Sequence, residues 1–225
     1  MTMGLTLPIV AGAGAMAVAF GSFEKSMNRV KALTGATGKD FEALKNQAKE
    51  LGMTTKFSAG EAADAMGFLG MAGFKTKEII GAMPNVLELA AAATLDVASA
   101  ADITSNIMTG FGQTTEDLAH TNNALVKAFT SANTDLTQLG QAFKYAGPIA
   151  KSAGLSFEST AASLALMGNA GIQGSMAGTS LRGAITKLLG PTNKAAKEIR
   201  NLGLNAKDSE GNIRPMDEIV RQLEK

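Results

Sequence analysis

Apolar side chains recur along the chain at helical spacing, in runs separated by glycine or by a polar residue that can cap a helix. In the first clear run they occupy one face at positions i, i+4, i+7 and i+10, which are Phe23, Met27, Val30 and Leu33. Later helices are expected to start near Thr37, Ser58, Thr76, Asp96, Thr114, Thr134, Ser156, Ser175 and Pro191. The pattern predicts an all-α protein of about ten helices.

One part of this pattern occurs twice, 98 positions apart and without a gap. Residues 57–74, FSAGEAADAMGFLGMAGF, and residues 155–172, LSFESTAASLALMGNAGI, share an early serine, small residues and a glycine before a large apolar residue. Serine can accept from the free N–H groups at a helix start, and glycine can take the positive φ of a helix end. The register continues into a second helix in both copies. We therefore predict an array of helical hairpins with two related repeats, residues 58–92 and 156–189.

Prolines and turn residues divide the helical pattern further. Thr37 with Asp40 predicts a capping box at one helix start. Pro84 and Pro148 lie inside apolar segments, where each is expected to kink or stop a helix and so to mark a corner. Residues 204–214, LNAKDSEGNIR, predict a turn and a short hairpin, the only non-helical region of the sequence.

The segment before the first charged residue is the most uniformly apolar part of the chain. A secretory signal would need Lys or Arg ahead of the apolar run, and none is present. A membrane-spanning helix needs about 20 apolar residues, whereas this run is shorter and is interrupted by Pro8. Small residues at four-residue spacing favour a helix that lies at a membrane interface or packs closely in a bundle. They are Ala13, Ala17 and Gly21.

These patterns divide the chain into an uncharged hydrophobic segment, residues 1–22, and a helical domain, residues 23–225. The last predicted helix begins at Pro215, and the sequence stops within it at Lys225 without a cap. We therefore expect the helical domain to be truncated at its C-terminal end.

Composition mainly excludes functions. Lys and Arg total 21 against 20 for Asp and Glu, in no long block of one sign, so no basic stripe indicates sequence-specific nucleic-acid binding. The absence of Cys excludes disulfides, zinc–thiolate sites and a Cys nucleophile. His120 stands alone on a polar helix, which predicts a solvated side chain and no metal site. With 25 glycines and 5% aromatic residues, the helices are expected to approach closely through small side chains.

Two glycine-rich segments could suggest nucleotide binding. Residues 12–17, GAGAMA, match a dinucleotide-binding turn, but Pro8 would interrupt the strand before it and no acidic residue closes a second strand. Residues 35–39, GATGK, lack the glycine spacing of a phosphate loop, and Asp rather than Ser or Thr follows the lysine. We therefore predict no cofactor-binding residues.

Two further segments could suggest catalysis or anion binding. Glu61 near an apolar run could be the general acid of a peptidoglycan-cleaving enzyme, but it stands three residues after Ser58, where a capping-box Glu belongs. Its counterpart in the second repeat is Ser159, which cannot do acid chemistry. Residues 170–182, AGIQGSMAGTSLR, could form an anion nest, although they are more typical of a tight turn between helices. We predict no catalytic and no metal-binding residues.

Six segments, in this order, resemble the core region of the phage tail tape-measure protein family. They are FEKSMNRVKALTG (23–35), ELGMTTKFSAGEAADAM (50–66), PNVLELAAA (84–92), ADITSNIMTGFG (101–112), the stretch 145–185 that contains AGTSLR, and GNIRPMDEI (211–219). The resemblance implies a long, mostly helical protein that occupies the lumen of a growing tail, sets its length and leaves during DNA delivery. Members of the family are generally much longer than this chain.

The resemblance thus implies a structural, non-enzymatic component of a bacteriophage or prophage tail. The implied partners are the tail tube protein, tail assembly chaperones, tail tip or baseplate proteins and further copies of the chain. The implied locations are the virion tail lumen, the host cytoplasm during assembly and, through residues 1–22, the host inner membrane on infection. Two alternatives from the residues stay open: a membrane-active or pore-forming helical protein, and a fragment of a cell-wall hydrolase.

Overall fold

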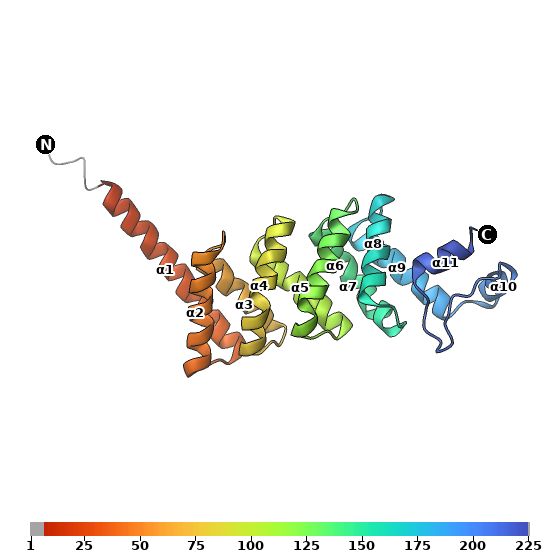
Figure 1. The fold of residues 1–225 in the computed structure, drawn as a ribbon, viewed down its shortest axis with the longest axis horizontal. Helices are drawn as coiled ribbons and strands as arrows, with labels where there is room; N and C mark the ends of the chain where they lie inside the picture. Colours follow the sequence, from red (N-terminus) through yellow and green to blue (C-terminus); the bar gives the residue numbers. More distant parts are fainter. Residues whose placement is uncertain (1–6, 225) are drawn as a thin grey trace. The chain divides into compact units, whose positions relative to one another are not determined.

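The computed structural model describes the backbone of residues 7–224 and the side chains of residues 21–224. The described part forms eleven α-helices, one short 3₁₀ helix and no β-strand, so the all-α prediction is confirmed (Figure 1). The α-helices are α1 (Leu7–Thr34), α2 (Gly38–Thr54), α3 (Ala59–Met71), α4 (Thr76–Ala93), α5 (Val97–Phe111), α6 (Leu118–Thr130), α7 (Leu136–Ser152), α8 (Phe157–Asn169), α9 (Gly174–Leu189), α10 (Asn193–Asn201) and α11 (Met216–Gln222). The 3₁₀ helix, Thr115–Asp117, precedes α6. Most helix starts predicted from the sequence lie within two residues of the observed ones, but the start near Thr114 precedes the 3₁₀ helix, with α6 beginning at Leu118, and the apolar run from Phe23 lies inside α1.

The chain divides into two compact units, Met1–Asp102 and Ile103–Lys225. In the first unit, α1 packs on α3, while α2 packs against α3 and α4. The predicted face of α1 is buried at Phe23, Met27 and Val30. The close approach of α1 to α3 depends on Gly70 of α3, because a Cβ at that position would lie 2.8 Å from Cγ2 of Thr34 in α1.

In the second unit, α7 packs along α9, and α8 packs against α6, α7 and α9. Gly178 of α9 lies so close to the backbone of Ala142 in α7 that a Cβ there would clash with it. An aromatic cluster lies beside this contact between α7 and α9. Its ring centroids, those of Phe111, Phe143 and Phe157, are 5.3 to 5.9 Å apart. The unit therefore combines close glycine contacts with one aromatic cluster.

The bounds of the helices follow the 98-residue offset of the sequence repeat. Helices α3 and α8 each have 13 residues, and each begins after a serine whose side chain accepts from the backbone N–H three residues later. They end before Gly73 and Gly171, whose φ angles are +93° and +78°. Superposition of the two hairpin backbones in space stays a prediction.

The offset also extends to the preceding helix, which the sequence comparison missed. Helix α2 runs from residue 38 to 54 and α7 from 136 to 152, again 98 positions apart. The two buried positions of α2, Leu44 and Ala48, correspond to Ala142 and Ala146, which are among the eight buried positions of α7. The offset in helix bounds therefore covers at least three helices, and a structural repeat of these helices stays a prediction.

The prolines are expected to kink or stop their helices, and neither stops one, because Pro84 lies within α4 and Pro148 within α7, whereas a kink at either residue stays a prediction. Proline removes one backbone donor, which frees the carbonyl four residues earlier. For Pro84 this is the carbonyl of Ile80, and it accepts instead from Nε2 of Gln47 in α2 at 2.7 Å. A side chain from a neighbouring helix thus replaces the missing backbone bond.

Two further predictions about helix ends are wrong. Thr37 is the N-cap of α2, but its side chain makes no capping hydrogen bond, so the capping box with Asp40 is absent. Helix α11 ends at Gln222 with Leu223 as its C-cap, so the sequence does not stop within this helix. The short hairpin predicted between α10 and α11 is confirmed by an antiparallel bridge between Lys207 and Ile213.

The hydrophobic segment predicted over residues 1–22 falls partly outside the described residues. From Leu7 onward its backbone belongs to α1, which continues without a break to Thr34. Treating residues 1–22 as a separate domain therefore stays a prediction. Within the described part of the chain, no helix is both long and apolar enough to span a membrane.

Candidate functional site

Glu61, the candidate general acid, lies at the start of α3 in the predicted capping box. Its Oε2 accepts from the backbone N–H of Ser58 and from the Ser58 hydroxyl, both at 2.7 Å. In return the Ser58 hydroxyl accepts from the backbone N–H of Glu61 at 3.2 Å. The carboxylate thus satisfies free N–H groups at a helix start on the exposed surface, which is a structural role.

His120, which the sequence predicts to be solvated and alone, is exposed but has a partner. Its Nε2 lies 2.8 Å from Oε1 of Glu158 at the start of α8. Burial opposes ionisation of Glu158, yet hydrogen bonds from its own backbone N–H, from His120 and from Ser156 lower the pKa of its carboxyl. The pair joins α6 to α8. Within residues 21–224, no three His, Cys, Asp or Glu side chains are grouped closely enough to hold a metal ion.

Of residues 170–182, the candidate anion nest, residues 170–173 form the turn between α8 and α9, and residues 174–182 belong to α9. The N–H groups at the turn are used locally: Gly171 N–H donates to Gly168 O and Ile172 N–H to Met167 O, both at 2.9 Å. The side chain of Gln173 bonds to the carbonyl of Asn133, before α7. The tight-turn interpretation is confirmed, since these groups are engaged within the protein.

The glycine-rich segments that superficially match nucleotide-binding loops also have structural roles. Residues 12–17 lie within α1, so their backbone is helical and forms no turn after a strand. Residues 35–39 connect α1 to α2, and Gly35 and Gly38 have φ angles of +68° and +52°.

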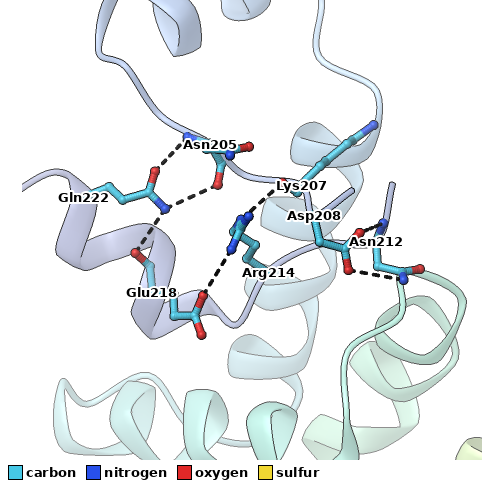
Figure 2. Close-up of polar contacts among 7 residues, drawn as sticks. All are labelled: Asn205, Lys207, Asp208, Asn212, Arg214, Glu218 and Gln222. Atoms are coloured by element: carbon cyan, nitrogen blue, oxygen red, sulfur yellow. Dashed lines mark hydrogen bonds and ion pairs between the residues drawn. The ribbon is translucent and has the colours of Figure 1, made fainter. Parts of the chain in front are cut away.

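A compact polar hairpin joins α10 to α11, and five of its residues make polar contacts with one another or with Glu218 and Gln222 of α11 (Figure 2). The side chain of Gln222 pairs with the backbone of Asn205, accepting from its N–H at 2.7 Å and donating to its carbonyl at 3.3 Å. Arg214 Nε donates to the carbonyl of Lys207 at 3.1 Å, and its guanidinium lies 3.8 Å from the carboxylate of Glu218. Helix α11 is thereby fixed to both sides of the hairpin, at Asn205 and at Arg214.

Asp208 organises the turn of this hairpin. Its Oδ1 accepts from the backbone N–H groups of Glu210 and Asn212, both at 2.9 Å. Desolvation opposes ionisation, but these bonds, with others from the Asn212 side chain and the Gly211 N–H, lower the pKa of the Asp208 carboxyl. The charged carboxylate therefore stabilises the turn.

The hairpin also covers the ends of two other helices. Ile213 N–H donates to the carbonyl of Ala153 at the end of α7, at 2.7 Å, and Lys207 Nζ donates to the carbonyl of Leu189 at the end of α9, at 2.8 Å. The last carbonyls of a helix lack partners within it. The hairpin supplies a donor at each end: Ile213, within the GNIRPMDEI segment, for α7, and Lys207, which precedes that segment, for α9.

An apolar groove of ≈ 680 Å³ runs between α8, α9 and α11. Two of its apolar side chains are widely exposed, Leu166 at 60% and Val220 at 50%. Apolar surface gathered in one place is typical of a protein-binding surface. The lining residues are Ser163, Leu166, Met167, Ala170, Ile172, Ser180, Leu181, Ala184, Met216, Asp217, Val220, Arg221 and Glu224.

A second hollow of ≈ 590 Å³ lies between α6 and α8, with alanines along it and the His120–Glu158 pair at its rim. At the corresponding place in the first unit, α1 packs directly on α3. There the guanidinium carbon of Arg29 lies 5.2 Å from the ring centroid of Phe68. Sequence reasoning missed both hollows, because each depends on how helices pack rather than on a motif.

Comparison with known proteins gives a consistent result. Residues 45–225 match the family described as "Phage-related minor tail protein". The chain is 40% identical over 223 residues to the "Tape measure protein" of Pneumococcus phage Dp-1, a match that covers 99% of this chain and 19% of that protein. It is 32% identical over 204 residues to the "Probable tape measure protein" of Escherichia phage P2, covering 90% of this chain and 25% of that protein. The chain thus spans a quarter or less of the length of these relatives, and no solved structure matches it.

Proposed function

Because the chain belongs to the family of phage-related minor tail proteins, we propose that it is the folded core segment of a tape-measure protein and a structural component of a phage or prophage tail. The observation that carries this proposal is the similarity to a tape measure protein along 99% of the chain. The helical structure and the structural role of Glu61 agree with a scaffold rather than with a hydrolase.

The proposed partners are the tail tube protein, tail assembly chaperones and tail tip or baseplate proteins. The apolar groove between α8, α9 and α11 supports such contacts, since it is open and lined by side chains that would be covered in an assembly. The proposed locations are the host cytoplasm during assembly and then the lumen of the tail.

A folded segment has a different task from the measuring part of a ruler. An α-helix extends by about 1.5 Å per residue, and a hairpin loses most of that rise when the chain reverses. The segment therefore contributes docking and assembly, while the length of the tail is set by the remainder of the longer protein. The small share of its relatives that the chain covers leaves room for such a remainder.

The test uses the phage or prophage that encodes the chain. An epitope tag in the gene allows immunogold electron microscopy and mass spectrometry of purified tails. We expect the chain in the tails, and no tails of normal length after deletion of the gene. A Glu61→Gln strain is the matched control and should make normal tails, because Gln can also complete a capping box. Absence of the chain from purified tails, with normal assembly in the deletion strain, would overturn the proposal.

A further inference from the structure

Helix α10 is an amphipathic arm without a buried side chain. Ala195, Ile199 and Leu202 follow at i, i+4 and i+7, which places them on one face. None of the nine residues of α10 is buried, and the Leu202 side chain is 60% exposed. Isolated helices of this length are marginal in water. The arm therefore needs a surface that covers its apolar face.

The arm leaves the body of the second unit, and the chain is bonded to that unit again at Asn205, Ala206 and Lys207. Lys207 Nζ donates to the carbonyl of Leu189 at 2.8 Å, so the chain is closed at the base of an excursion over residues 190–206. The N-terminal end of α10 is capped by the Thr192 hydroxyl, which accepts from the N–H of Ala195 at 3.3 Å. The arm is thus a formed helix on a fixed base.

The same unit carries an open groove that matches the arm. The groove between α8, α9 and α11 exposes Leu166 and Val220, which are the kind of side chains that an Ile and a Leu of a helix would contact. The charges also match. The arm carries Lys194, Lys197 and Arg200 against Glu198, a net of +2, while the charged residues that line the groove are Asp217 and Glu224 against Arg221, a net of −1.

We propose that α10 of one copy of this chain docks in the α8–α9–α11 groove of a second copy. Arm and groove are different surfaces, so each bound copy still offers one free arm and one free groove. Such a head-to-tail contact builds a ring when the rotation closes and an open row when it does not. A nine-residue helix buries little area, so the contact is weak and depends on concentration. This proposal goes beyond the tail role and is tested on the isolated chain.

The first experiment uses the absence of cysteine from the natural sequence. Ile199→Cys and Val220→Cys are made as separate single variants of the chain, one of them isotope-labelled, and are mixed under a mild oxidant. We expect a disulfide-linked dimer of one labelled and one unlabelled copy, at least several-fold more abundant than in either variant alone. Lys197→Cys, on the opposite face of α10, mixed with Val220→Cys is the matched control and should cross-link far less.

The second experiment does not depend on cross-linking. Leu202→Glu removes the arm contact and Leu166→Glu the groove contact, and sedimentation reports the association of each variant against concentration. We expect each variant alone to stay monomeric at concentrations at which the natural chain associates. The mixture should form dimers and nothing larger, because one intact arm meets one intact groove.

Three results would overturn the proposal. The first is that the natural chain stays monomeric at millimolar concentration. The second is that Lys197→Cys cross-links to Val220→Cys as efficiently as Ile199→Cys does. The third is a double variant, Ile199→Cys with Val220→Cys, that closes its disulfide within one chain at nanomolar concentration, which would assign the groove to the arm of its own copy.

Discussion

At the end of α8, Gly171 has a φ of +78°, and a Cβ added there would meet no neighbour within 4 Å. Any cost of a substitution therefore comes from the backbone alone. A β-branched residue in this region is an outlier, and the strain amounts to about 1 to 3 kcal/mol. Gly171→Val should lower the free energy of unfolding by about that amount, with a smaller loss for Gly171→Asn, because Asn tolerates positive φ. Thermal melts of the three proteins measure it.

Thr94, the C-cap of α4, provides the reciprocal control, since it is a β-branched residue that already has a φ of +55°. Thr94→Gly removes that strain and should raise the melting temperature, although glycine also gains freedom in the unfolded chain. If Gly171→Val and the natural protein melt alike, backbone strain at this helix end is refuted.

Asp208 gives the chain a pH-dependent contribution to stability. Because its pKa is lower in the folded protein than in the unfolded chain, the contribution is present above the unfolded value of about 3.9 and is lost as the pH falls further. Above about pH 5 the natural protein should therefore melt at a higher temperature than Asp208→Asn, and the gap should narrow below about pH 4. Both proteins share the other acidic groups, so a gap that is constant with pH would contradict the assignment.

At the scale of elements, the sequence predicts helix starts well because caps are local. Ser58 and Ser156 begin α3 and α8 as expected, since a serine and the N–H three residues later lie in one turn. Pro84 shows where local reasoning ends. Whether proline stops a helix depends on a substitute donor, and that donor is Gln47, 37 positions earlier in the sequence. Only the packing of α2 on α4 brings the two together.

The role of Gln47 can be measured with a double-mutant cycle. Gln47→Leu leaves the carbonyl of Ile80 without its donor and should cost about 1 to 3 kcal/mol of unfolding free energy. In a Pro84→Ala background, residue 84 regains an N–H that can reach the same carbonyl, so the cost of Gln47→Leu should be smaller. Urea unfolding of the four proteins gives the coupling. Strictly additive effects would show that Gln47 does not compensate for the proline.

The repeat shows a related limit at this scale. The sequence relates α3 to α8 because the serine before each helix and the glycine after it are identical in the two segments. The sequence does not show the relation between α2 and α7. Their bounds agree, but Leu44 of α2 corresponds to the smaller Ala142 of α7. Leu44 and Ala142 are both buried, but their side chains differ in volume. Helix α7 lies close against α9 at Gly178, whereas α2 contacts α4 through the longer side chain of Gln47.

At the scale of the whole molecule, family membership could be predicted from six short segments, and the match over residues 45–225 confirms it. The candidate binding surface could not be predicted. Its groove combines Leu166 of α8 with Val220 of α11, which are separated by the turn, α9, α10 and the polar hairpin. The segment GNIRPMDEI is visible in the sequence, but only the hydrogen bonds show that its Ile213 covers the end of α7 and that Lys207, just before the segment, covers the end of α9.

The compact second unit leads to a prediction about tail length in a phage that carries the full gene. Deletion of residues 156–189 removes α8 and α9, and with them the partners of α7 and the walls of the groove. We expect tails to be lost or unstable, and surviving tails to keep their length, because a reversed helical pair adds little extension. Excision of the same number of residues from a long helical region should instead give viable, shorter tails. Electron microscopy decides between the two outcomes: shortening by about 1.5 Å per deleted residue after removal of residues 156–189 would show that this hairpin is part of the ruler itself.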